Sequence, residues 1–266
     1  MSKNIHFADL LCYTYIVTEN CRIREPGKSE PDALKQDVSE VPRLEKKRTF
    51  MELKADNEGI DSWEEVILVY TAALRQIETK MEILNDEFQH VHQYNPIEHI
   101  KSRIKTPESI VKKLKRNSHE STIENMVKYV NDIAGIRIIC SFTSDIYRIA
   151  DMISEQRDIR VLGIKDYITF PKASGYKSYH MIVSVPVYLS DRIVNTKVEI
   201  QIRTVAMDFW ASLEHKIHYK FEGDAPEHIR SELVECAKMV ADLDERMLSL
   251  NEEILSLSQA EKEKNP

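Results

Sequence analysis

The stretch Val198–Thr204, VEIQIRT, places a carboxylate in a segment that otherwise has the composition of a β-strand. Neighbouring side chains of a strand alternate between faces, so the apolar residues share one face and Glu199, Gln201 and Arg203 share the other. A carboxylate on a sheet must face water or have a cationic partner, because burying it alone is costly. Glu199 is therefore exposed, or paired with Arg203, or it acts as a magnesium ligand or general base.

A second carboxylate, Asp132, lies in NDIAGIR, at the end of a predicted helix and just before a predicted strand. Taken alone, Asp132 is equally consistent with a simple turn residue. Arg137 interrupts the apolar strand that follows, where an unpaired cation is costly, so it requires an anion or a stacking partner. Since Mg²⁺ takes one or two carboxylates together with phosphate oxygens, Asp132 and Glu199 could supply the protein ligands of a magnesium nucleotide site.

The stretch KDYITFPKASGYKSYH, residues 165–180, combines cations and aromatic rings with one of the 6 glycines of the chain. Gly175 would allow a tight turn or a close approach of the backbone to a ligand, with Tyr176 and Lys177 pointing at that ligand. The Tyr176 ring offers a flat face for a nucleobase. Neither G-x-G-x-x-G nor G-x-x-x-x-G-K-[ST] occurs, so side-chain cations would have to neutralise phosphates. The candidate cations are Arg103, Lys105, Arg137, Lys172 and Lys177.

The elements that must position these residues are visible as periodic patterns. Apolar residues recur every three or four positions over 63–91, which predicts a long amphipathic helix capped by Ser62. Further helices are expected after the cap Thr106 and after a capping box formed by Ser121 and Glu124. Strands are expected at 135–142, 160–168, 178–189 and 196–204, followed by helices at about 205–221 and 226–260. The pattern predicts an α+β fold, a mixed sheet of four to five strands surrounded by helices, with long helices at both ends.

Composition describes an ordinary soluble protein with a real core: 42% hydrophobic and 30% charged residues, with a net charge of −7. A negative net charge argues against a general affinity for nucleic acid or anionic membranes, although the segment Lys101–Arg116 is strongly basic. The 4 cysteines form no C-x-x-C pair, and we expect a cytosolic protein without a membrane anchor. The histidines of HKIH, 215–218, lack further nearby ligands for a zinc site.

Five motifs, in this order, resemble the synthetase domain of the RelA/SpoT family: SRIKTPESI, DIAGIRI, DYITFPKASGYKSYH, VEIQIRT and MDFWASLEHKIHYKF. More narrowly, the chain resembles the small alarmone synthetases of the RelQ type, from about Ser62 to Ser258. The resemblance implies a nucleotidyltransferase-like fold and a (p)ppGpp synthetase of the stringent response. Such enzymes move the β,γ-pyrophosphate of ATP to the 3′-hydroxyl of GDP or GTP, with GMP as a further candidate acceptor. The chain has no His-Asp dipeptide of the family's hydrolase domain, so synthesis alone is expected.

The resemblance also assigns roles to residues on the donor side. Arg103 and Arg137 match the arginines that sandwich adenine, and Lys105 and Ser109 lie on the ATP segment. The magnesium ligands correspond to Asp132 and Glu199, of which Glu199 also activates the 3′-hydroxyl.

On the acceptor side, Tyr176 matches the tyrosine that stacks on guanine, and Lys172, Lys177 and His180 match the loop that holds phosphates. Asp208 stands where some relatives carry Asn or His, which puts the acceptor preference in doubt.

Three segments are expected: a flexible extension (1–60), the synthetase domain with its preceding helix (61–222), and a C-terminal helix for packing and oligomerisation (223–266). An apolar stripe along the last helix supports a homo-oligomer, and the resemblance implies a tetramer with an allosteric cleft. The stripe comprises Leu233, Cys236, Val240, Leu243, Met247, Leu250, Ile254 and Leu257. Alternatively, this stripe packs on the helix that starts at Ser62. Candidate partners are allosteric (p)ppGpp and single-stranded RNA.

Two other functions compete with nucleotide synthesis. A toxin-type relative that pyrophosphorylates tRNA 3′ ends would need a basic surface, which the net charge of −7 disfavours. A non-catalytic module that binds RNA or alarmone would not need both Asp132 and Glu199.

Overall fold

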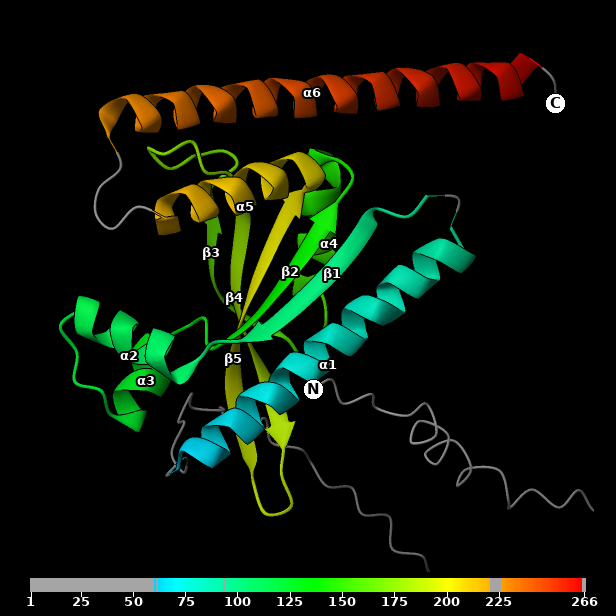
Figure 1. The fold of residues 1–266 in the computed structure, drawn as a ribbon. Coiled ribbons are helices and arrows are strands. Elements are labelled where there is room, and N and C mark those ends of the chain that lie inside the picture. The colour runs from blue at the N-terminus through cyan, green and yellow to red at the C-terminus, as the bar shows by residue number, and fades with distance from the viewer. Residues whose placement is uncertain (1–59, 61, 93, 221–225, 265–266) are drawn as a thin grey trace, which may run out of the picture. The chain divides into compact units, whose positions relative to one another are not determined.

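The computed structural model describes residues 60, 62–92, 94–220 and 226–264. All of them belong to one compact unit, Glu52–Pro266. The expected extension 1–60, apart from Ile60, lies outside the described residues. The elements, in chain order, are α1 (Trp63–His90), β1 (Ile97–Ile104), α2 (Pro107–Arg116), α3 (Ile123–Tyr129), β2 (Ala134–Cys140), α4 (Thr143–Ser154), β3 (Arg160–Asp166), β4 (Tyr179–Tyr188), β5 (Ile193–Thr204), α5 (Val205–Lys220) and α6 (Glu227–Lys264) (Figure 1).

The five strands form one sheet in the order β1-β2-β5-β4-β3. The pair β2 and β5 is parallel, and the other pairs are antiparallel, so the predicted mixed sheet is confirmed. The edge strand β1 was not among the predicted strands. Its sequence IEHIKSRI buries Ile97 but leaves most other side chains exposed, so it lacks the apolar run by which the central strands were recognised.

One face of the sheet carries the hydrophobic core. The apolar residues of VEIQIRT are fully buried, as are Ile136 and Ile138 of β2 and Met181 of β4, which lie on the same face. The helices α1 and α4 pack on this face, joined by a contact of the Arg148 guanidinium with the Phe88 ring. The predicted stripe of α1 is confirmed up to Phe88, but Val91 lies beyond the helix and is 74% exposed.

Local capping residues set where the helices begin. The side chains of Ser62 and Thr106 cap α1 and α2, as predicted. The predicted capping box at Ser121 and Glu124 is wrong: α3 begins one residue later, and Thr122 Oγ1 accepts a hydrogen bond from the Asn125 N–H at 3.2 Å.

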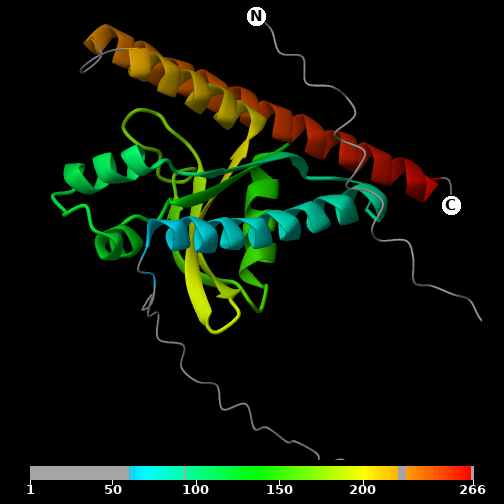
Figure 2. The same cartoon turned by 60° about the horizontal axis from the view of Figure 1, so that its bottom comes forward.

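The long helix α6 packs against α5 in both ribbon views (Figures 1 and 2). Trp210 Nε1 of α5 donates a hydrogen bond to the Leu233 carbonyl of α6 at 3.0 Å. The alternative that α6 packs on the helix starting at Ser62 is therefore wrong, since α5 is its main partner. Among the described helices, none combines the length and apolar character needed to cross a bilayer.

Candidate active site

The register of the strands places two rows of polar positions on the face opposite the core. Directly paired residues point to the same side of a sheet. One row runs through Arg103, Gly135, Glu199, Ile182 and Gly163. The next row runs through Lys101, Arg137, Gln201, His180 and Lys165. Residues from four motifs far apart in the chain thus become neighbours through strand pairing.

A cavity of about 190 Å³, here called the β1-side cavity, opens over the first part of these rows. Its lining includes Arg103, Asp132, Arg137 and Glu199, so it brings together four of the predicted site residues. Gly135 forms part of its floor: a Cβ there would meet only the Glu199 carbonyl oxygen, at 3.9 Å. Packing within the protein therefore does not require glycine at this position, and its effect is to leave the cavity open.

Asp132 lies in the turn between α3 and β2, where two lysines reach it. Lys105 Nζ is 2.7 Å from one carboxylate oxygen, and Lys113 Nζ is 2.8 Å from the other. Burial alone would raise the pKa of Asp132, but the hydrogen bonds from Lys105 and Lys113 hold this pKa below its usual value. Asp132 is consequently a half-buried carboxylate that stays ionised, and the alternative of a plain turn residue does not account for its two partners.

A second cavity of about 660 Å³, the β3-side cavity, lies on the other side of the two carboxylates. Its lining includes the predicted Lys172 and His180 together with Lys113 and Lys165, and it is rich in positive charge. Asp132 and Glu199 line both cavities. The two carboxylates therefore stand where the cavities meet, each cavity having its own set of cations.

Glu199 is held by neighbours on its own face of the sheet. Gln201 Nε2 donates to Glu199 Oε2 at 2.8 Å, and His180 Nδ1 lies 3.4 Å from Glu199 Oε1. Burial would raise the Glu199 pKa, but His180 and Gln201 together hold it below the usual value. The proposed Glu199–Arg203 pair is wrong, because Gln201 stands between them and accepts a hydrogen bond from Arg203 at 3.1 Å.

Arg203 is a buried centre of hydrogen bonds. It donates to Ser178 Oγ at 3.2 Å and to Asp208 Oδ1 at 3.2 Å, and it contacts the Tyr176 hydroxyl. Asp208 also accepts from Arg137 Nη1 at 3.0 Å. Asp208 therefore orients Arg137. This ion pair explains why the apolar strand β2 tolerates a cation.

Tyr176 is engaged by side chains of the protein. Its hydroxyl lies 2.8 Å from His180 Nε2, and the Lys172 ammonium and Arg203 guanidinium lie 4.5 and 5.0 Å from its ring centroid. The ring lines neither the β1-side nor the β3-side cavity. A base that stacks on Tyr176 would have to displace one of these cations, so the stacking role stays a prediction.

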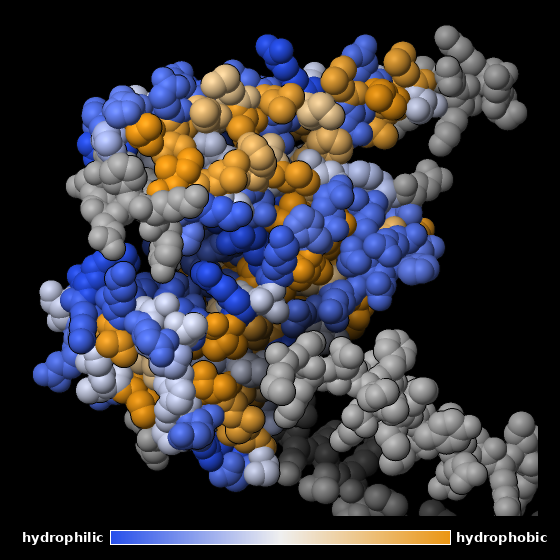
Figure 3. Space-filling view, viewed as in Figure 1, coloured by the Kyte–Doolittle hydropathy of each residue, from blue (hydrophilic) through white to orange (hydrophobic). Residues whose placement is uncertain are grey.

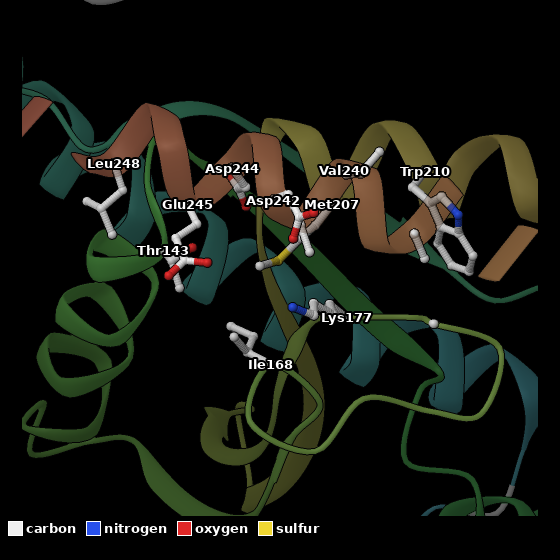
Figure 4. A pocket seen from close by; sticks show the side chains of 13 residues that line it. Thr143, Ile168, Lys177, Met207, Trp210, Val240, Asp242, Asp244, Glu245 and Leu248 are labelled. Carbon is white, nitrogen blue, oxygen red and sulfur yellow. The ribbon is translucent and has the colours of Figure 1, made fainter. Parts of the chain in front are cut away.

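Lys177 and Ser109 are not brought to the two cavities. Lys177 lines a third cavity, of about 330 Å³, between the loop and α6, here called the α6 cavity, and Figure 4 shows its side chain pointing into that space. The expectation that Tyr176 and Lys177 point at one ligand is wrong in this conformation, since the two side chains enter different surroundings. Ser109 lies in the exposed first turn of α2, where its hydroxyl is bound by Thr106 at 3.0 Å.

Two residues of this site, Lys113 and Lys165, were not predicted from the sequence. The role of Asp208 was not predicted either. Lys113 follows Ser109 by four positions, one helical turn, so the helical spacing of SRIKTPESIVKK could have indicated it. Lys165 is the first residue of the stretch 165–180 and pairs with His180 across strands β3 and β4. The sequence contains no signal that joins Asp208 to Arg137, because that contact depends on how α5 leaves β5.

The donor set suits magnesium rather than a protein-only metal cage. Within the described part of the chain, no group of three or more His, Cys, Asp or Glu side chains is arranged to hold a metal ion. Mg²⁺ does not need such a group, because it keeps water and takes substrate phosphate oxygens beside one or two carboxylates. Asp132 and Glu199, both ionised and lining the same cavities, fit that requirement.

Comparisons with known proteins point to one family. Residues 102–224 match the region found in RelA / SpoT proteins. The chain is 48% identical over 195 residues to the GTP pyrophosphokinase YwaC of Bacillus subtilis, covering 73% of this chain and 93% of that protein. It is 36% identical over 195 residues to the GTP pyrophosphokinase YjbM of the same organism, covering 72% and 90%.

Solved structures agree with these relatives. The crystal structure of small alarmone synthetase 2 from Bacillus subtilis aligns with a TM-score of 0.66 at 47% identity, covering 73% of this chain and 100% of that one. Small alarmone synthetase 1 from the same organism, bound to its product pppGpp, aligns with a TM-score of 0.68 at 34% identity, covering 72% and 97%.

Proposed function

The chain belongs to the small alarmone synthetases of the RelA/SpoT family, and from that premise we propose that it makes (p)ppGpp. It would transfer the β,γ-pyrophosphate of ATP to the ribose 3′-hydroxyl of GDP or GTP. The observation that carries the proposal is the position of Asp132 and Glu199, at the junction of two cavities lined by cations. A transfer between two nucleotides requires two anionic ligands whose reacting groups meet at one place.

The β1-side cavity is proposed to take ATP. Arg103 and Arg137 line it and offer guanidinium planes to the adenine, since Arg stacks well on aromatic rings. Lys105 and Lys113, which hold Asp132 where the two cavities meet, supply positive charge for the phosphates there, and Lys113 also lines the β3-side cavity. Ser109 on the first turn of α2 is retained as a further proposed ATP contact.

The β3-side cavity is proposed to take the acceptor. Lys172 and His180 line it and would bind the acceptor phosphates, and Tyr176 would stack on guanine after its present partners move. Lys177 is proposed for this site only after a movement out of the α6 cavity.

The reaction asks the protein for positioning, charge neutralisation and one proton acceptor. The 3′-oxygen forms a bond to the β-phosphorus of ATP while the bond from that phosphorus to the α-phosphate oxygen breaks, and AMP leaves. Glu199, kept ionised by His180 and Gln201, takes the hydroxyl proton. Asp132 and Glu199 would hold Mg²⁺, which when bound neutralises charge on the donor phosphates.

A homo-oligomer, proposed to be a tetramer, fits the surface of α6. Hydrophobic residues gather along this helix in Figure 3. The outward members of the predicted stripe are each about half exposed or more: Leu243, Met247, Leu250, Ile254 and Leu257. An exposed apolar stripe of this length calls for a partner, and a second copy of the chain is the one we propose. Allosteric (p)ppGpp, single-stranded RNA and a cytosolic location stay predictions.

The test is to incubate the full chain with ATP and Mg²⁺ and, separately, GMP, GDP, GTP or tRNA, and to separate the products by chromatography. We expect AMP and a guanine nucleotide that carries two added phosphates. Pyrophosphorylated tRNA without a nucleotide product would instead support the toxin-type alternative, and no product in any mixture would support a binding module.

A further inference from the structure

The loop that carries Tyr176 rests on α6 at Gly175. The φ of Gly175 is +87°, a backbone conformation that favours glycine. A Cβ at this position would lie 2.4 Å from the Cβ of Ala237, far closer than two non-bonded carbon atoms can approach, and 3.8 Å from the Cα of Val234. Ala237 is itself buried. The contact therefore leaves no room for a side chain at position 175 or for a side chain larger than alanine at position 237.

Tyr176 belongs to the same contact. It packs against a small apolar cluster that joins α5 to α6, formed by Trp210, Ala211 and Ala237 with Leu233 and Val240. The turn before it is closed by backbone hydrogen bonds from Gly175 N–H to the Lys172 carbonyl at 2.8 Å and from Lys172 N–H to the Tyr176 carbonyl at 3.2 Å. The position of the Tyr176 ring thus depends on where α6 meets the turn.

Lys177, on the other side of Tyr176, also faces α6. Its side chain enters the α6 cavity, into which Asp244 reaches from the helix (Figure 4). Asp244 is buried and accepts a hydrogen bond from Thr204 Oγ1, at the end of β5, at 2.7 Å. Burial raises the pKa of Asp244, and the positive charge of Lys177 opposes that rise. Gly175, before Tyr176, thus contacts α6 directly, and Lys177, after it, faces the same helix across the cavity.

We propose that Ala237 of α6 is a positioning residue of the acceptor site. By filling the space that Gly175 leaves, Ala237 fixes the turn and so sets where Tyr176 presents its ring to the acceptor base. The proposal rests on the proposed function for the identity of that base, a guanine. Neither the β1-side nor the β3-side cavity has a lining residue on α6. Ala237 therefore acts only through the turn at Gly175, and its effect falls on the nucleotide that Tyr176 is proposed to contact, the acceptor.

The first test compares Ala237→Leu with Cys236→Leu in the full chain. Cys236 is the neighbouring residue of α6 and is exposed, so the same leucine there leaves the turn untouched. We expect Ala237→Leu to raise KM for the guanine acceptor by roughly tenfold while KM for ATP stays within about twofold, and Cys236→Leu to change neither. Equal increases in both KM values for Ala237→Leu, with a folded protein, would overturn the proposal.

A double-mutant cycle removes the risk that a leucine at this position displaces the whole helix. Gly175→Ala should raise the acceptor KM by roughly tenfold, because its Cβ meets that of Ala237. Ala237→Gly should change it by less than about threefold, and the double variant should regain part of the loss, since the carbon–carbon overlap is gone while the positive φ persists. A double variant no better than Gly175→Ala would show that the contact with Ala237 does not matter.

A third readout needs no catalysis. Hydrogen exchange of the nucleotide-free protein should be faster in the peptide containing Gly175 for Ala237→Leu than for Cys236→Leu. If wild type makes no alarmone but this exchange difference is found, the proposed function fails and the α6 contact stands. If exchange in this peptide is unchanged, the positioning role fails whatever the activity.

Discussion

The β1-side and β3-side cavities meet at the same two carboxylates but are built in different ways. The first takes Arg103 and Glu199 from one row of the sheet and Arg137 from the next row, so the strand register places all three, while Asp208 of α5 orients the Arg137 side chain. The second depends on a loop, whose Tyr176 is already bonded to His180 and covered by Lys172. On the proposed assignment, the donor half is built mainly by the sheet, whereas Tyr176 and Lys172 of the acceptor half would change partners when a base stacks on Tyr176.

The junction between the two halves should respond most strongly to mutation. Glu199→Gln keeps the size and the hydrogen-bonding capacity of the side chain but removes the proton acceptor and a metal ligand. We expect kcat to fall by at least about 10²-fold, on the scale of general-base effects, with little change in Tm. Turnover near that of wild type, measured by product chromatography, would show that Glu199 is not the proton acceptor.

Tyr176→Ala should weaken binding of the guanine nucleotide far more than binding of ATP. Stacking of a base on an aromatic ring contributes roughly 1–3 kcal/mol by alanine substitution, and this loss should fall on the guanine nucleotide. Calorimetric titration with GTP and, separately, with a non-hydrolysable ATP analogue measures it. Equal losses for both nucleotides would mean that Tyr176 serves the packing between loop and α6 and reads no base.

Two glycines in one row of the sheet provide a matched pair. Gly135 lines the β1-side cavity and Gly163 the β3-side cavity, and a Cβ at either position meets no close neighbour. Gly135→Val should raise KM for ATP, and Gly163→Val should raise KM for the acceptor, each by about tenfold, because the new side chain occupies ligand space. Valine also suits a strand, so both variants should fold. The same nucleotide affected by both changes would contradict the division into two cavities.

The smallest effect on chemistry is expected from the outer stripe of α6. Leu243→Glu with Leu250→Glu places charges at two residues more than half exposed, away from Ala237. Light scattering should show a smaller assembly than wild type, while the acceptor and donor KM values keep their ratio. A monomeric wild type would end the oligomer proposal.

The sequence predicted the parts of the site that depend on local pattern. The alternation in VEIQIRT correctly placed Glu199 opposite the buried isoleucines, and Ser62 and Thr106 correctly marked two helix starts. The edge strand β1 was missed because its exposed polar residues hide the strand pattern. Lys177 was misplaced because neighbouring side chains of an extended loop point to different sides, and only the position of α6 decides which side faces a cavity.

The contacts that no pattern could predict are those between distant elements. Asp208 holding Arg137, and Ala237 meeting Gly175, each join residues brought together by the path of α5 and α6 after β5. In both cases the residue types are ordinary for a helix, so composition and spacing contain no trace of their partners.

Isotope tracing tests the central claim most directly, namely that two nucleotides react at the junction formed by Asp132 and Glu199. Wild type and Glu199→Gln are incubated with GDP, Mg²⁺ and ATP that carries ³²P either at the γ- or at the α-position. The account predicts that wild type transfers the γ-label to the guanine nucleotide as an intact pyrophosphate on the 3′-oxygen, leaves the α-label in AMP, and loses this transfer in Glu199→Gln. Release of the γ-label as inorganic phosphate without a labelled guanine product, or equal transfer by both proteins, would contradict it.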